Sequence, residues 1–107
     1  VWCSEFGEGL TFSLSWRFKE YSSSQLSGLS LIVGLAIIRV LRCFSIEGVS
    51  LKWPNDVLVN GFKIAGVLIE LQSGIMRSCQ TVIGIGINFN LSKGTKSSID
   101  CGVTDLF

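Results

Sequence analysis

The sequence predicts an α+β domain in which a mixed β-sheet carries one long helix on one face. Three observations predict this class: an alternating segment at residues 10–18, an apolar segment at residues 25–43, and a series of short β-rich segments after it. Strands that flank a single helix are typical of a helix layer packed on a sheet layer. A chain of 107 residues supports one hydrophobic core, so we expect a single domain.

The first predicted strand covers residues 10–18. Apolar and polar side chains alternate there without interruption, and the apolar set is Leu10, Phe12, Leu14, Trp16 and Phe18. A period of two predicts a half-buried strand whose apolar side meets the core.

The predicted helix covers residues 25–43, where apolar side chains recur at 3.6-residue spacing. Gly28 and Gly34 lower the helix propensity and predict close packing on the sheet. The most apolar part, residues 29–41, is shorter than the roughly 20 residues that cross a bilayer. We therefore expect a buried helix and no membrane partner.

Further strands are predicted after the helix, over residues 49–53, 57–59, 62–71 and 80–90. Pro54 ends the first of them, because proline cannot donate a ladder hydrogen bond. Asn60-Gly61 lies between two β-rich runs and predicts a hairpin with a type I′ turn.

The composition excludes several classes of function. A net charge of +1 gives no electrostatic support for binding DNA or RNA. The absence of histidine excludes histidine-based catalytic triads and zinc sites. The cysteines Cys3, Cys43, Cys79 and Cys101 show no CxxC spacing, and no signal peptide is apparent, so we expect reduced thiols and a cytoplasmic location. A hydrophobic content of 48% suggests a piece of something larger.

The segment Lys52-Trp53-Pro54-Asn55-Asp56 is the first candidate for chemistry. Proline restricts the residue before it to extended geometry, and Asn and Asp side chains stabilise turns. An ordinary turn between two strands is therefore one interpretation. The other is that Asn55 and Asp56 are presented at a strand end, the first as a hydrogen-bonding amide and the second as a carboxylate for a metal or an amine.

The second candidate is Lys63, the only charged residue between Asp56 and Glu70. An ammonium among apolar neighbours can neutralise a substrate carboxylate and a phosphate that must approach each other. Gly66 would let a ligand lie against the backbone. The alternative is a solvated lysine that protects a hairpin edge from aggregation.

The third candidate is Gly84-Ile85-Gly86-Ile87-Asn88. It is no dinucleotide fingerprint, because Phe89 stands where the third glycine would fall. Two glycines on one face of a strand favour a flat platform for a planar group, with Asn88 hydrogen-bonded to that group. A bulge or a closely packed helix would also explain the glycines.

The order and spacing of these segments resemble the catalytic domain of biotin protein ligases, in the biotin/lipoate ligase family. The resemblance extends from Trp2 to about Asn90, and Lys52–Asp56 is its most specific part. Phe6-Gly7 and Gly28-Leu29-Ser30 also agree with the family pattern. The resemblance implies a class II synthetase-like fold and a two-step reaction. Biotin and ATP give biotinyl-5'-AMP and pyrophosphate with the help of magnesium, and a lysine of a carboxylase's biotin carboxyl carrier domain then takes the biotin.

The resemblance also implies a role for each candidate residue. Lys63 would contact both the biotin carboxylate and the phosphate, as an electrostatic positioning group, and Asp56 would assist the metal or the incoming amine. The biotin channel would be lined by Lys63, Gly66, Val67 and Trp2. The nucleotide would be contacted by Asn55, Asp56, Lys63, Gly84, Gly86 and Asn88.

The sequence departs from the family pattern in several places. The arginine-glycine loop that precedes the equivalent of Trp2, the earlier biotin-binding strands and the small C-terminal β-barrel are absent from the printed sequence. Glu5 stands where proline is usual. We therefore expect a partial catalytic domain over residues 1–107, with weak or lost activity by itself.

Other functions stay open on the sequence. Lipoate ligation shares the fold and the lysine, although the Trp-Pro-Asn-Asp sequence favours biotin. A non-catalytic remnant that serves as an interaction or dimerisation module is a second alternative, because exposed sheet edges pair readily and a homodimer is then expected. A third interpretation, an unrelated membrane-associated piece, is supported by the hydrophobic content alone.

Overall fold

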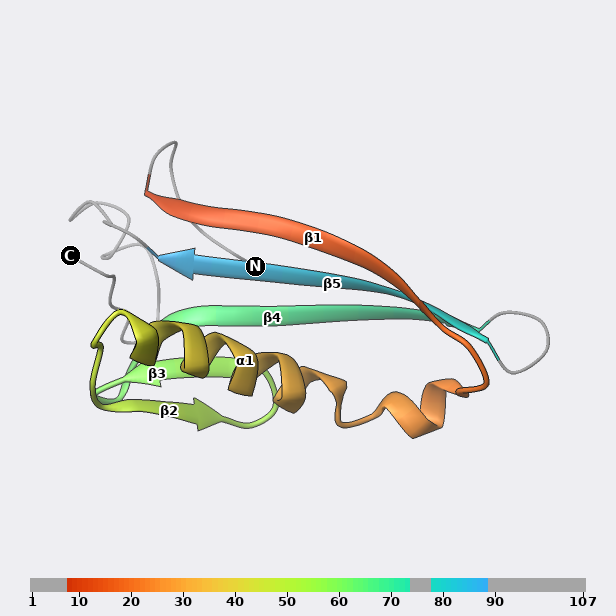
Figure 1. Ribbon diagram of the computed structural model, residues 1–107, viewed down its shortest axis with the longest axis horizontal. Helices are drawn as coiled ribbons and strands as arrows, with labels where there is room; N and C mark the ends of the chain where they lie inside the picture. Colours follow the sequence, from red (N-terminus) through yellow and green to blue (C-terminus); the bar gives the residue numbers. More distant parts are fainter. Residues whose placement is uncertain (1–7, 74–77, 89–107) are drawn as a thin grey trace.

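The computed structural model describes residues 8–73 and 78–88 (Figure 1). Its elements in chain order are β1 (Gly9–Phe18), the 3-10 helix η1 (Ser23–Leu26), α1 (Leu29–Cys43), β2 (Val49–Lys52), β3 (Asp56–Val59), β4 (Phe62–Ser73) and β5 (Cys79–Asn88). The predicted succession of a strand, a long helix and a series of strands is confirmed, with boundaries that differ by one or two residues at most strand ends.

The strands form one five-stranded sheet in the order β1-β5-β4-β3-β2. Every neighbouring pair is antiparallel. The α+β class is confirmed, but the expectation of a mixed sheet is wrong for the residues that the structure describes. The physical reason is that β2 to β5 follow one another directly, without the long crossover that parallel pairing requires.

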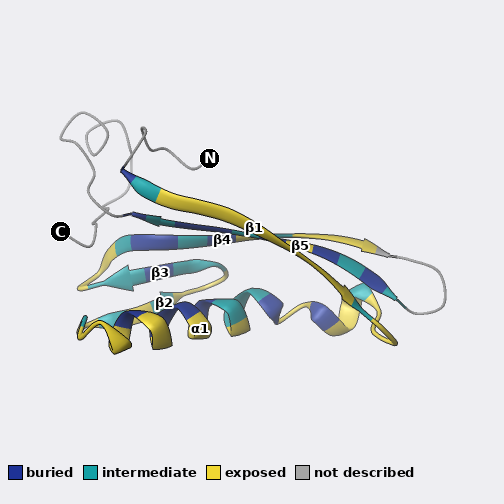
Figure 2. Ribbon diagram, turned by 45° about the horizontal axis from the view of Figure 1, so that its top comes forward, coloured by how far each residue is buried: buried dark blue, intermediate teal, exposed yellow. Residues whose placement is uncertain are grey.

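The helix α1 lies on one face of the sheet, over β2, β3 and β4 (Figure 2). The buried core between them consists of Leu29, Ile37, Ile38, Leu41, Val57, Ile64, Ala65, Val67, Ile83 and Ile85. A Cβ atom on Gly34 would lie 2.6 Å from Cδ2 of Leu51, so close packing is confirmed there. The prediction of close packing is wrong for Gly28, which precedes α1 and has open space around it.

The predicted helix over residues 25–43 is divided in two. Ser22 caps η1, and its backbone N–H donates to Oε1 of Gln25 over 2.8 Å. The α-helix begins only at Leu29. The stretch Ser23–Cys43 contains an 18-residue window with a mean hydropathy of 1.9 and is long enough to cross a membrane. Only 22% of that window is buried, so the expectation of a buried helix is wrong for its outer face.

The apolar row of β1 is on the same face as α1 but lies outside its cover, because β1 is the far edge strand. Phe12 is 38% exposed, Leu14 53% and Trp16 63%. The predicted strand is confirmed, and its predicted half-burial is wrong for most of the row. One helix covers only part of a five-stranded sheet, as Figure 2 shows.

The β3–β4 hairpin has the predicted turn, because both Asn60 and Gly61 have positive φ, at 51° and 84°. The register then shifts: Leu58 pairs with Lys63, whereas Val57 pairs with Ala65, which leaves Ile64 as an extra residue. This β-bulge puts Lys63 on the same face as Asp56 and Gly66. Without it, Lys63 would share the face of Ala65 and point into the core.

Candidate active site

A groove of about 370 Å³ lies on the face of the sheet opposite α1, and we call this face the open face. It is lined by Thr11, Phe12, Ser13, Asn55, Asp56, Lys63, Gly66, Val67, Leu68, Gly84, Ile85 and Gly86. The three segments predicted to carry chemistry, one at the turn from β2 to β3, one in β4 and the third in β5, therefore meet at one place. The turn interpretation of Lys52–Asp56 and the solvated-edge interpretation of Lys63 do not account for this meeting.

The register of the sheet explains how the groove forms. Gly66 pairs with both Asp56 and Gly86, and Gly86 pairs in turn with Thr11. Directly paired residues point to the same face, so these side chains form one row across the strands. The next row joins Ser13, Gly84 and Leu68 in the same way. The glycines carry no side chain, and they give the groove a flat floor.

The charged pair of the groove is Lys63 with Asp56. Nζ of Lys63 lies 3.1 Å from Oδ1 of Asp56, and the two side chains are 29% and 27% exposed. Neither charge is fully removed from water, so the pair contributes little to stability. Its importance is geometric, because it holds an ammonium over the glycine floor where an anion can enter.

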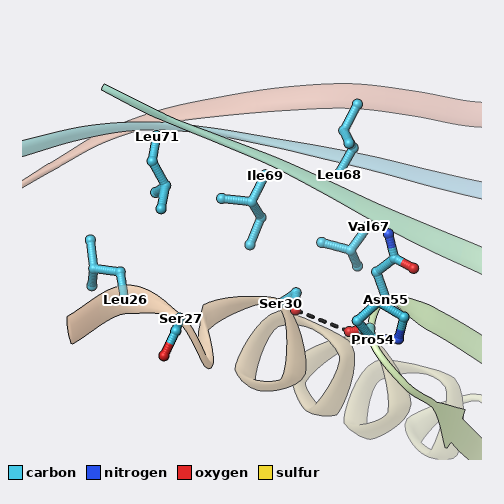
Figure 3. A pocket seen from close by; sticks show the side chains of 9 residues that line it. All are labelled: Leu26, Ser27, Ser30, Pro54, Asn55, Val67, Leu68, Ile69 and Leu71. Atoms are coloured by element: carbon cyan, nitrogen blue, oxygen red, sulfur yellow. Dashed lines mark hydrogen bonds between the residues drawn. The ribbon is translucent and has the colours of Figure 1, made fainter. Parts of the chain in front are cut away.

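The turn Trp53-Pro54-Asn55-Asp56, which we call the Pro54 corner, forms one wall of the groove. The backbone N–H of Val67 donates to the carbonyl of Asn55 over 2.9 Å, which ties the corner to β4. Oγ of Ser30 donates to the carbonyl of Pro54 over 3.0 Å, which ties it to α1 (Figure 3). Two separate elements therefore fix the corner's position.

A second hollow of about 240 Å³ lies beside the first, between the helices and β4. It is lined by Leu26, Ser27, Ser30, Pro54, Asn55, Val67, Leu68, Ile69 and Leu71, which Figure 3 shows from close by. Asn55, Val67 and Leu68 line both hollows. Asn55 of the Pro54 corner and two residues of β4 thus form the boundary between them.

Most of the predicted site residues lie in the groove: Asn55, Asp56, Lys63, Gly66, Val67, Gly84 and Gly86. Val67 contributes main chain, because its own side chain is only 3% exposed and belongs to the core. Asn88 lies on the open face two positions beyond Gly86; it is 3% exposed and does not line the groove. Trp2 lies outside the described residues.

The sequence interpretation missed Thr11 and Ser13, whose hydroxyls line the groove from β1. They belong to the polar side of the alternating strand, which was expected to face solvent. The signal that could have identified them is the pairing of β1 with the glycines of β5. Among the described residues no group of three acidic or cysteine side chains could hold a metal ion.

The comparisons with known proteins agree with this geometry. The model of the Biotin/lipoate A/B protein ligase family matches residues 1–88. The chain belongs to this family of ligases.

Individual relatives place it more narrowly, near the biotin-specific members. The bifunctional ligase/repressor BirA of Escherichia coli strain K12 is 37% identical over 101 residues, which cover 94% of this chain and 31% of the relative. The biotin--[acetyl-CoA-carboxylase] ligase of Paracoccus denitrificans is 44% identical over 63 residues, 56% of this chain and 26% of the relative. The chain therefore spans about a third or less of the length of these curated relatives.

A solved structure of biotin protein ligase from Aquifex aeolicus, in complex with biotin and ATP, has the same arrangement. It superposes with a TM-score of 0.70 at 34% sequence identity and covers 92% of this chain and 39% of that chain. The predicted biotin ligase-like fold is thereby confirmed.

Proposed function

We propose that the groove binds biotin together with the nucleotide, and that the protein to which this chain belongs ligates biotin to a lysine of a carrier protein through biotinyl-5'-AMP. The observation that supports it is the position of the Lys63 ammonium, on a glycine floor and 3.1 Å from Asp56. The relatives of known activity are biotin ligases.

The first step joins two anions, which is why it requires a cation. The biotin carboxylate attacks the α-phosphorus of ATP, an oxygen–phosphorus bond forms, and pyrophosphate leaves. Lys63 lies where one ammonium can contact both the carboxylate and the phosphate, and it lowers their repulsion as they approach. It forms no covalent bond in this mechanism, because its role is to position and neutralise.

The floor of the groove accommodates the flat parts of the ligands. Gly66 and the main chain of Val67 line the biotin side, and Gly84 and Gly86 lie toward the nucleotide. Asn88, two positions further along β5, stays a prediction for the nucleotide, because it is 3% exposed and does not line the groove. Trp2 stays a prediction for the biotin channel.

In the second step a lysine amine of the carrier attacks the mixed anhydride, and AMP leaves. Asp56 is the carboxylate in the groove and can accept a hydrogen bond from the incoming amine. The same carboxylate would be the protein's ligand to magnesium, which in phosphate chemistry is held mostly by phosphate oxygens and water and neutralises the phosphates. The single carboxylate of Asp56 would be enough for a magnesium ion that is held in this way.

The partners follow from the same chemistry. The carrier is a biotin carboxyl carrier domain of a carboxylase, as the name of the Paracoccus relative suggests. A homodimer is also proposed, through the edge of β4, because β4 continues to Ser73 while its pairing with β3 ends at Gly66. Exposed strand edges of this kind pair with further chains. We place the protein in the cytoplasm, without a nucleic-acid partner for this domain.

Titration calorimetry tests the binding part of the proposal. We expect heat from biotin and more heat from a stable biotinyl-adenylate analogue, with none from lipoate. Heat from lipoate alone would reassign the chain to lipoate ligation.

Transfer of labelled biotin to a carrier protein tests the catalytic part. We expect little or no transfer from residues 1–107 alone, because they span about a third or less of the length of the relatives of known activity. Robust transfer would contradict the view that these residues are a partial catalytic domain. Absence of both binding and transfer would favour an interaction module.

A further inference from the structure

We infer that Ser30 is a positioning residue for the adenylate side of the groove. It holds the Pro54 corner, and with it Asn55 and Asp56, at a fixed distance from the helix layer. The effect of Ser30 on ligand binding rests on the proposed function. The hydrogen bond between Ser30 and the corner does not depend on it.

The hydrogen bond of Ser30 is unusual for a serine at this place in a helix. Ser30 is the second residue of α1, so it does not occupy the N-cap position, which is Gly28 and has no side-chain cap. Its Oγ is instead 3.0 Å from the carbonyl oxygen of Pro54, a residue 24 positions further along the chain. A carbonyl oxygen only accepts, so the serine hydroxyl is the donor.

Two long-range hydrogen bonds hold the corner in addition to the pairing of its flanking strands. It connects β2, an edge strand of the sheet, with its neighbour β3, and each has only four residues. Pro54 has no N–H of its own to bind the neighbouring backbone. The corner is tied to β4 on one side, through the carbonyl of Asn55, and to α1 on the other, through Ser30.

A shift of the corner would reach the reacting groups directly. Asn55 and Asp56 follow Pro54 in the chain, and both line the groove. Asp56 is also the ion-pair partner of Lys63. Displacements of about 1 Å at reacting groups cost up to roughly 100-fold in rate. Ser30 therefore acts on the site without lining the groove itself.

The variants Ser30→Ala and Ser30→Thr test this role in calorimetric titrations with biotin and with the biotinyl-adenylate analogue. We expect Ser30→Ala to lose about 3- to 10-fold in affinity for the analogue, the equivalent of one hydrogen bond, with biotin affinity unchanged. Ser30→Thr keeps the hydroxyl and restores the affinity. Ser27→Ala is the matched control, because Ser27 lines the same hollow but points away from Pro54 (Figure 3).

Hydrogen exchange of the Val67 amide provides a readout that needs no ligand. Its N–H is bound to the Asn55 carbonyl, so a loosened corner exposes it. We expect faster exchange in Ser30→Ala and wild-type exchange in Ser30→Thr. If Ser30→Ala does not fold, Ser30→Thr and Ser30→Val form a pair that differs by the hydroxyl alone.

The outcomes separate the two proposals. If the wild-type chain binds neither biotin nor the analogue, the proposed function fails, and Val67 exchange still decides whether Ser30 holds the corner. If the wild type binds the analogue and Ser30→Ala binds it equally well, the positioning role is overturned. Equal losses in Ser30→Ala and Ser30→Thr would overturn it as well, since the hydroxyl would not be the cause.

Discussion

Lys63 and Asp56 lie 3.1 Å apart on the open face because Ile64 is an extra residue in β4. The bulge reverses the direction of Lys63 relative to a regular strand, and Ile64 itself points into the core at 1% exposure. The direction of the Lys63 side chain and the packing of Ile64 in the core thus depend on the same β-bulge.

Removing the ammonium should weaken binding of the anionic ligand. We expect Lys63→Ala to lose at least 10-fold in biotin affinity, about 1.4 kcal/mol, because no other cation lines the groove in the described part of the chain. Calorimetry measures this. Lys19→Ala, at an exposed turn, is the control and should bind as the wild type does. Equal affinity in Lys63→Ala would remove the basis of the proposed function.

Neutralising the partner carboxylate should act in the opposite direction. Asp56→Asn removes a negative charge that competes for Lys63, so we expect biotin alone to bind a few-fold more tightly. The free energy of unfolding should change by less than about 1 kcal/mol, as for exposed ion pairs. The difference between Asp56→Asn and wild type should shrink in high salt. Weaker biotin binding by this variant would contradict an electrostatic role for the pair.

The glycine floor can be filled without disturbing the fold. A Cβ on Gly84 would lie 3.4 Å from the Leu68 carbonyl oxygen, an ordinary contact, so Gly84→Ala should unfold at or slightly above the wild-type temperature. The methyl group would still raise the floor, and we expect about 10-fold weaker binding of the biotinyl-adenylate analogue. Gly28→Ala, with open space around it, controls for the loss of a glycine. Full affinity in Gly84→Ala would show that the ligand lies elsewhere.

Shortening the buried side chain of Ile64 should destabilise the folded protein. We expect Ile64→Ala to lower the free energy of unfolding by about 2–5 kcal/mol and Ile64→Val by about 0.5–1.5 kcal/mol, because the cavity grows with the atoms removed. Urea titration measures both. The valine variant should keep wild-type biotin affinity, since the bulge remains. A cost below about 0.5 kcal/mol for alanine would mean that Ile64 does not pack as described.

The sequence predicted the elements well where a periodic pattern or a turn signal was strong. The alternation of residues 10–18 and the Asn60-Gly61 turn each predicted an element that the structure confirms. The break at Ser27-Gly28 was missed, because a helical period continues across it. The exposure of the Trp16 row was missed as well, since it depends on strand order, which no local pattern encodes. The antiparallel sheet was missed although the short connections from β2 to β5 favour it.

The site was predicted in large part from residue types, but its assembly was not. The resemblance located Lys63, Asn55 and Asp56, and register then brought Gly66 and the β5 glycines beside them. The bulge at Ile64 has no sequence signal of its own, and neither does the long-range hydrogen bond of Ser30. Both features arise from tertiary packing, which a local sequence pattern does not predict.

The partial cover that α1 gives the sheet has a geometric consequence. A helix is roughly 10 Å wide, whereas strands are spaced by about 4.8 Å, so one helix shields about two such intervals. Five strands need nearly twice that width. The side chains of Phe12, Leu14 and Trp16 therefore stay outside the helix layer, and we expect residues 1–107 by themselves to self-associate through this apolar row as their concentration rises.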